Sequence, residues 1–184
     1  MVVHSGSSAP VVLTRRQLVR RGIVGTILIA AAGATGAFWW PTRRRKPRAG
    51  LKVFDETEAS ILSAVATAVL AIEPGAPSPD DVDVVGRIDT LLALSPVPVQ
   101  REFARLLHIF ENGTTGLLTA TGWTSFTAAG PASREARLHA WQTSRIALFR
   151  TGFQAMKRLC AACYYSSPVS WPAIAYPGPP DILA

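Results

Sequence analysis

The chain has few of the residues from which enzymes build active sites. Its 184 residues include three histidines and two cysteines, and charged residues make up only 17% of the total. Two cysteines are too few for disulfide bonds to stabilise a small fold, so its stability must come from packing. No Gly-x-Gly-x-x-Gly sequence or phosphate-cradling loop occurs. The sequence therefore has no evident nucleotide or flavin site, and we expect no cofactor of its own.

The histidines also offer no catalytic group. His4 lies in the N-terminal segment, and His108 and His139 stand alone in helical patterns. Because no nearby residues complete a triad or a set of metal ligands, we interpret all three as surface or packed residues. The sequence therefore predicts no catalytic residue and no metal site, and an enzyme acting alone is the least favoured class.

Acidic residues are absent from the first fifty positions. Residues 1–50 hold nine Lys and Arg, which leaves ten basic residues against twelve acidic ones from Leu51 onward. A nucleic-acid-binding domain would carry its surplus positive charge on the folded body, where it neutralises phosphates. The distribution therefore argues against a nucleic-acid partner. It divides the chain into an export signal with a basic linker (1–50) and one compact domain (51–184).

The N-terminal segment has the layout of an export signal. Thr14-Arg15-Arg16-Gln17-Leu18-Val19-Arg20 resembles the twin-arginine signal of bacterial Tat export, with Arg15 and Arg16 as the arginine pair. An uncharged run of 19 residues follows, from Gly22 to Trp40. As a helix it would measure about 28 Å, close to the ~30 Å bilayer core. The alternative is an ordinary membrane anchor flanked by arginines.

The fate of this leader is open from the sequence. Small residues before and at Ala37 allow cleavage, whereas the aromatic residues 38–40 resemble an interfacial anchor. We expect a periplasmic, Tat-exported protein, anchored to the inner membrane if the leader is not cut.

The residue pattern predicts helices throughout the body. Asp55 followed by Glu58 predicts a capped helix start, and apolar residues recur on one face as far as Ile72. The same spacing predicts helices over 84–94 and 95–112, and one long helix over 133–165. No segment alternates apolar and polar residues, so the fold class is all-α, a small irregular helical bundle behind an N-terminal signal or transmembrane helix. The two later stripes predict these core residues: Phe103, Leu106, Leu107, Phe110, Trp141, Phe149, Phe153, Met156, Cys160 and Tyr164.

The two cysteines are three residues apart near the end of the last predicted helix. Tyr164 stands where covalent c-type haem would need His after Cys163, which excludes that motif. A thioredoxin-like pair would lie at a helix N-terminus. Two interpretations stay open for Cys160 and Cys163: small core residues, or a disulfide formed after export.

The tail from Ser166 to Ala184 contains five prolines, with Trp171 and Tyr176 between them. Proline removes backbone donors and fixes φ, so we expect an extended strap rather than a helix. Such a strap either wraps its own domain or presents its aromatic residues as anchors for a partner.

Together these features resemble the gluconate 2-dehydrogenase subunit 3 family. The resemblance rests on the twin-arginine leader, the Phe54-Asp55-Glu56-x-Glu58 helix start, the proline-rich break before an Asp-bearing helix, and the ending Tyr164-Tyr165-Ser166-x-Pro168-x-x-Trp171-x-x-x-x-Tyr176-x-Gly178-Pro179. The ending is its most specific part. Ala175 stands where the pattern predicts Gly.

The resemblance implies a small, non-catalytic helical subunit of a periplasmic FAD-dependent dehydrogenase. Its partners would be a large FAD-containing subunit of the glucose-methanol-choline (GMC) type and the Tat translocase, with electrons passing to a cytochrome c or a quinone. The predicted partner-binding residues are Tyr164, Tyr165, Trp171, Tyr176 and Pro179. The alternative function is a membrane-tethered periplasmic structural or assembly protein without an oxidoreductase partner.

Overall fold

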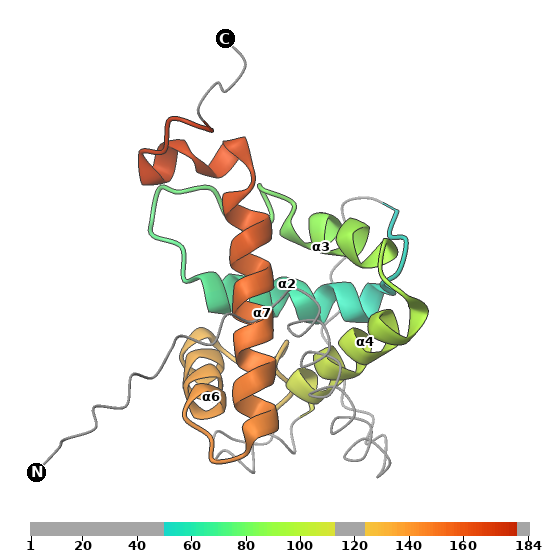
Figure 1. Cartoon of the computed structure of the whole chain (residues 1–184). Helices are drawn as coiled ribbons and strands as arrows, with labels where there is room; N and C mark the ends of the chain where they lie inside the picture. The colour runs from blue at the N-terminus through green and yellow to red at the C-terminus, as the bar shows by residue number, and fades with distance from the viewer. Residues whose placement is uncertain (1–49, 113–123, 180–184) are drawn as a thin grey trace, which may run out of the picture.

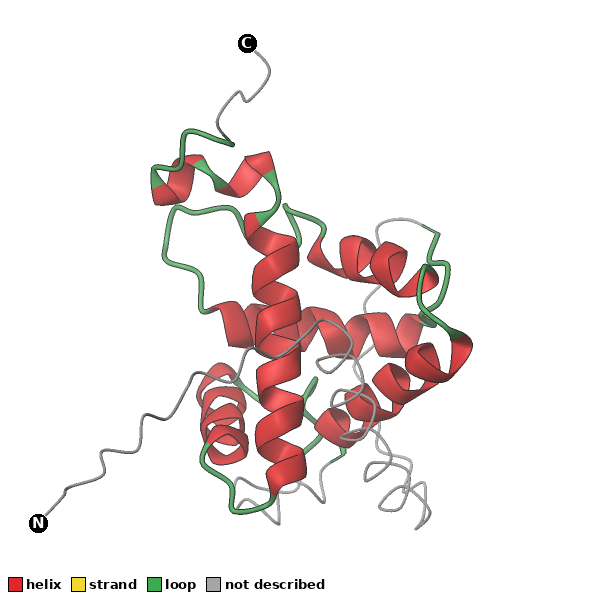
Figure 2. Ribbon diagram, in the orientation of Figure 1, coloured by secondary structure: helices red, strands yellow, loops and turns green. Residues whose placement is uncertain are grey.

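The computed structural model describes residues 50–112 and 124–179, which form a bundle of helices (Figures 1 and 2). These residues contain no strand, so the all-α prediction is confirmed for them. The predicted export signal lies, up to residue 49, outside the described residues. The elements are α2 (Glu56–Leu70), α3 (Val84–Ala93), α4 (Val97–Glu111), α6 (Pro131–Gln142), α7 (Ala147–Tyr165) and two 3-10 helices, η1 (Pro168–Ser170) and η2 (Pro172–Ile174).

Helix α2 begins where the sequence predicts. Asp55 Oδ1 accepts a hydrogen bond from the Glu58 amide at 2.7 Å, and Glu58 Oε2 accepts one from the Asp55 amide at 3.1 Å. Each carboxylate thus satisfies an amide that the helix leaves unpaired. The helix ends at Leu70 because Ala71 adopts a left-handed conformation with φ 45°. The predicted apolar face is therefore two residues shorter than expected, since Ile72 follows the helix.

Helix α7 is the central element. In Figure 1 it crosses α2, with α6 beside its first half and α3 towards its second half, and it contacts all three. At Gly152 the helix leaves no room for a side chain. A Cβ there would lie 2.9 Å from Leu106 Cδ1 and 3.3 Å from Trp141 Cζ3. Leu106 and the Trp141 ring would have to shift to admit a larger residue, so the packing of α7 on α6 favours glycine at this position.

The predicted apolar stripes form the core. Phe110, Trp141 and Phe149 stack in series, with ring centroids 3.8 and 4.7 Å apart. Such aromatic pairs contribute about 0.5–1.5 kcal/mol beyond their buried area. The other predicted core residues are buried as well, except Phe103, which is partly buried and lies 5.7 Å from the Phe54 ring.

Two buried carboxylates tie distant segments to the bundle. Asp89 of α3 accepts from the three consecutive amides of residues 52–54, at 2.7, 3.0 and 2.9 Å. Glu111 at the end of α4 accepts from the amide and the hydroxyl of Thr127, at 2.9 and 2.5 Å. Hydrogen bonds to a charged acceptor are the strong ones. Asp89 therefore fixes the segment before α2, and Glu111 fixes the segment before α6.

The single helix predicted over 133–165 is wrong, because residues 143–146 separate α6 from α7. The Thr143 hydroxyl donates to the His139 carbonyl at 2.9 Å, and Ser144 Oγ accepts from the Ile146 amide at 3.1 Å. Side chains that bond nearby backbone groups compete with the helical ladder. Adjacent Thr and Ser residues thus turn the chain between two helices.

The tail is also more compact than the extended strap that we predicted. Pro168 opens η1 and Pro172 opens η2. Proline suits the first position of a helical turn, because its fixed φ is helical and its missing N–H would have no partner there. Regular turns therefore continue to Ile174, and in the described part of the tail residues 176–178 have no regular structure.

Candidate docking site

The end of α7 and the two 3-10 helices lie together at one end of the bundle (Figure 1). We call residues 165–179 the C-terminal turns. The backbone changes direction directly after α7: the Ser166 amide donates to the Ala162 carbonyl at 3.0 Å, and the Ser167 amide donates to the Tyr164 carbonyl at 3.2 Å. The turns therefore continue from the helix without a loose connection.

Two buried serines hold the C-terminal turns on the bundle. The Ser170 hydroxyl bonds the carbonyls of Tyr164 and Ser167, at 2.9 and 2.8 Å. The Ser167 hydroxyl accepts from Arg87 Nη2 at 3.1 Å. The same guanidinium donates from Nε to the Val82 carbonyl at 3.0 Å. Because Arg87 belongs to α3, these bonds join the turns to a helix 80 residues earlier in the chain.

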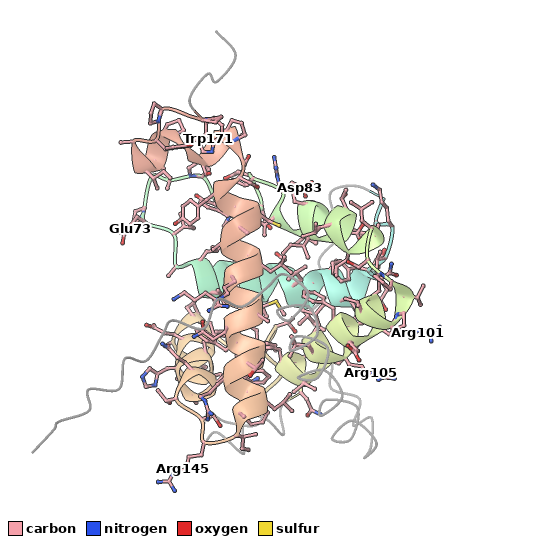
Figure 3. All side chains as sticks on the ribbon, in the orientation of Figure 1. Glu73, Asp83, Arg101, Arg105, Arg145 and Trp171 are labelled. Carbon is pink, nitrogen blue, oxygen red and sulfur yellow. The ribbon has the colours of Figure 1, made fainter. Side chains whose placement is uncertain are left out.

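Trp171 is the centre of the C-terminal turns (Figure 3). Its indole Nε1 donates to the Tyr165 carbonyl at 3.0 Å. Its ring meets that of Tyr176 edge to face, with centroids 5.3 Å apart, and a Cβ at Gly178 would lie 3.1 Å from its Cζ3. Gly178 also has φ 106°, which favours glycine. Trp171 therefore organises its own segment, and its ring is only partly available to a partner.

Tyr164 does not lie on the surface, contrary to its prediction as a partner contact. Its side chain is only 1% exposed, and its hydroxyl donates to the Pro77 carbonyl at 2.6 Å. Pro77 belongs to the proline-rich segment that follows α2. Tyr164 thus holds that segment against α7, and the aromatic stripe of the helix places its ring in the core.

Exposed apolar side chains nevertheless gather on the C-terminal turns: Tyr165 (43%), Val169 (52%), Ile174 (49%) and Tyr176 (43%). Of the predicted partner residues, Tyr165, Tyr176 and Pro179 are exposed, and Trp171 is half-buried. The sequence reasoning missed Val169 and Ile174, although each follows a proline within two residues. Large apolar side chains gathered on a rigid surface are typical of protein docking sites.

The backbone explains why the pattern predicts Gly at position 175. Ala175 ends η2 with φ 51° and ψ 35°, which is the left-handed region. A side chain costs about 1–2 kcal/mol there relative to glycine. Ala175 therefore holds a left-handed turn that glycine would fit better.

The cysteines are free, buried thiols. Burial raises the pKa of Cys160 to about 12, and the neighbouring Cys163 thiol contributes. Burial also raises the pKa of Cys163, although Arg87 partly opposes the shift. Protonated thiols are poor nucleophiles and poor metal ligands. The structure thus places both as core residues, the first of the two interpretations, and a disulfide after export stays a prediction.

His108 on α4 faces α2. Its Nε2 lies 3.7 Å from Glu58 Oε1, and the Glu58 carboxylate raises its pKa above the ordinary 6.5. Glu58 also caps α2, so the pair joins the start of α2 to α4. His139 lies apart on α6, as expected for a surface residue.

The described parts of the chain contain neither a candidate metal site nor a helix that could span a membrane. Within residues 50–112 and 124–179, no three His, Cys, Asp or Glu residues are grouped so that they could hold a metal ion. In the same ranges, no helix has both the length and the apolar character needed to cross a bilayer. Arg15 and Arg16 lie outside these ranges, so the predicted export signal stays a prediction.

Comparison with known proteins identifies the family. No curated protein and no solved structure matches the chain. The family model described as gluconate 2-dehydrogenase subunit 3 matches residues 56–178. The match runs from the first residue of α2 to Gly178 beside Trp171, so it includes both the bundle and the C-terminal turns. The chain therefore belongs to the gluconate 2-dehydrogenase subunit 3 family.

Proposed function

We propose that this chain, which its family makes a subunit of a dehydrogenase complex, is the non-catalytic small subunit of a periplasmic FAD-dependent enzyme of the GMC type. It binds the folded catalytic subunit, stabilises it and escorts it through the Tat translocase. The observation that carries the proposal is the family match over both the helical bundle and the C-terminal turns.

The described ionisable groups support an accessory role. Asp89 and Glu111 bond backbone amides, Glu58 caps a helix and pairs with His108, and both thiols are buried. Each group thus serves the packing of this chain. In this division of labour, FAD and the catalytic acid–base groups belong to the large subunit, which passes electrons to a cytochrome c or a quinone.

The C-terminal turns are the surface that we assign to the large subunit. Their exposed side chains are apolar, and residues 166–180 contain no charged residue. The hydrogen bonds of Ser167, Ser170 and Trp171 already order this backbone in the free subunit. Binding therefore loses little conformational entropy, and a partner gains by covering apolar surface.

An isoleucine pair offers a matched test of this surface. Ile174 on the turns is 49% exposed, and Ile146 between α6 and α7 is 50% exposed. We expect Ile174→Asp to weaken binding of the large subunit about 10–100-fold, because a charge would be buried at the interface, whereas Ile146→Asp leaves binding unchanged. The FAD absorbance that co-purifies with a tagged small subunit measures the effect.

Three outcomes of that experiment are distinct. Equal loss of FAD from both variants points to a general folding defect, which circular dichroism detects. Equal retention removes the C-terminal turns from the interface. Isolation of the wild-type chain without any flavoprotein favours the alternative, a membrane-tethered structural or assembly protein.

The predicted Tat leader supports the export part of the proposal. FAD is inserted in the cytoplasm, and the Tat system carries folded cargo, so one leader on the small subunit can export a catalytic partner that has none. Arg15 and Arg16 are the residues that we assign to the translocase.

A second arginine pair in the same leader provides the control. We expect Arg15→Lys with Arg16→Lys to leave the dehydrogenase activity in the cytoplasmic fraction, because the signal needs both arginines. The same charge-conserving change at Arg20 and Arg21 should preserve export. Normal periplasmic activity with both Arg15 and Arg16 replaced would contradict the escort role.

A further inference from the structure

The connection between α3 and α4 exposes a second group of apolar side chains. We call residues 91–99 the α3–α4 corner. Its large aliphatic residues are exposed as follows: Leu91 (48%), Leu94 (84%), Val97 (53%) and Val99 (39%). Leu94 is the most exposed large apolar residue among those that the structure describes. Contiguous exposed apolar groups on a soluble domain mark a binding surface.

The backbone of this corner is held in place. Gln100 donates from Nε2 to the carbonyls of Leu92 and Ser95, at 3.1 and 2.9 Å. The Ser95 amide donates to the Leu92 carbonyl at 2.8 Å. A structured corner therefore presents these side chains outwards.

Helix α4 carries two exposed arginines next to the corner. Arg101 and Arg105 of α4 are exposed and extend away from the bundle in Figure 3. Between Thr90 and Phe110, Glu102 is the one acidic residue. Aliphatic side chains next to arginines suit the boundary between acyl chains and anionic headgroups.

The N-terminal part of the chain joins the domain beside this corner. The amides of residues 52–54 bond Asp89, one turn before the end of α3, and the Phe54 ring lies 5.7 Å from Phe103 on α4. Only residues 41–50 separate Leu51 from the uncharged run 22–40. Ten residues span at most about 35 Å. If the leader is not cut and the run stays in a bilayer, which is one of the two fates that the sequence leaves open, the corner is held close to the membrane surface.

We propose that the α3–α4 corner rests on an anionic lipid bilayer, with Leu94 and Val97 in the interface and Arg101 and Arg105 at the lipid phosphates. The N-terminal run acts as the tether and the corner as the second, weaker contact, since stable anchoring generally takes two signals. The contact orients the domain, and the C-terminal turns stay free for the large subunit. This proposal does not rest on the identity of that subunit.

The experiment compares two labelling positions in the full-length chain. Leu94→Cys places a fluorophore on the corner, and Ile146→Cys places it at an exposed apolar position next to Arg145, which Figure 3 shows at the far end of the bundle from Arg101. The native thiols are buried, and the pKa of Cys160 is about 12, so the wild-type chain should react little with the label. Each chain is reconstituted in vesicles of phosphatidylethanolamine and phosphatidylglycerol that carry a doxyl-labelled lipid.

We expect the lipid quencher to reduce fluorescence at position 94 several-fold more than at position 146. Replacing phosphatidylglycerol by phosphatidylcholine, or Arg101 and Arg105 by Gln, should remove most of the difference while the tether keeps the protein on the vesicle. Equal quenching at the two positions would show tethering alone and overturn the proposal. A label at position 94 that is already shielded without vesicles, in a concentration-dependent way, would overturn it in favour of a contact between two copies.

Discussion

The C-terminal turns and the α3–α4 corner both expose large apolar side chains, but they differ in chemistry. The turns carry two exposed tyrosines and no charge from residue 166 to 180, whereas the corner carries aliphatic residues beside Arg101 and Arg105. Protein interfaces are enriched in aromatic residues and depleted of charge at their centre. Anionic membranes attract aliphatic residues flanked by arginine. Exposed apolar area alone therefore does not identify the kind of partner. The type and charge of the neighbouring residues distinguish a protein partner from a membrane.

The largest effect on stability should come from Asp89, the buried carboxylate of α3. We expect Asp89→Asn to lower the free energy of unfolding by about 3 kcal/mol, because a buried amide group replaces the charged acceptor of three backbone hydrogen bonds. Urea unfolding measures the loss. Hydrogen exchange should accelerate first at residues 52–54, on the corner side of the molecule.

The same substitution at a surface cap is the control. Asp83 accepts one longer hydrogen bond, from the Gly86 amide at 3.3 Å, and is exposed. Asp83→Asn should cost well under about 1 kcal/mol, since Asn is also a good N-cap. Equal losses at the two positions would mean that Asp89 does not anchor the segment before α2.

The next effect concerns the C-terminal turns. We expect Trp171→Ala to cost about 2 kcal/mol and to raise amide exchange over residues 166–179, because the indole hydrogen bond, the contact with Tyr176 and the packing on Gly178 are all lost. Trp171→Phe keeps a ring and should lose about 1 kcal/mol. Partner binding should fall with Trp171→Ala, while lipid quenching at position 94 stays unchanged. Simultaneous loss of both activities would show that the two surfaces are not independent.

A smaller, stabilising effect is expected at the turn that ends η2. Ala175→Gly should raise stability by about 0.5 kcal/mol, since relief of the left-handed backbone exceeds the entropy that glycine adds to the unfolded chain. Ala173 lies inside η2, so Ala173→Gly should destabilise by a similar amount. Thermal unfolding measures both changes, and a loss at position 175 would contradict the argument from φ.

The smallest effect is the pH dependence of His108. Its pKa is raised in the folded state by Glu58, so the extra stability is fully present below the ordinary pKa of 6.5 and disappears as pH rises through the folded pKa. More than half of the side chain is exposed, which limits the contribution to a few tenths of a kcal/mol. The stability difference between wild type and His108→Gln should therefore be larger at about pH 5.5 than at about pH 8.5. If the stability difference between wild type and His108→Gln does not vary with pH, the His108–Glu58 pair does not stabilise the fold.

The helical framework could be predicted because its signals are local. Asp55 and Glu58 satisfy each other's amides within one turn, and the stripes around Phe110 and Phe153 repeat along a single helix. The break at residues 143–146 could not be predicted, because Thr143 and Ser144 are also compatible with a helix. Their side-chain hydrogen bonds to nearby backbone groups favour the break instead.

The candidate docking site was less predictable. The aromatic ending marked a segment that exposes large apolar side chains, and three of its five predicted contacts are exposed. Tyr164 was predicted both in the core stripe and as a partner contact, and its burial fits only the first. The two could not be told apart, because a tyrosine on a helix looks the same whether its hydroxyl reaches water or the Pro77 carbonyl 87 residues away. No sequence pattern indicated the roles of Ser167 and Ser170, because their hydrogen bonds with Arg87 and with backbone carbonyls form only in the folded chain.

For this protein, residue spacing and capping pairs were enough to predict most helices and the core stripes, because each depends on neighbours within a few turns. Which apolar residues remain uncovered, and beside which charges, depends on how α3, α4 and α7 pack. Asp89 and Ser167 bring together segments that are 35 or more residues apart. No local pattern encodes such distances, because the contacts exist only after the chain has folded.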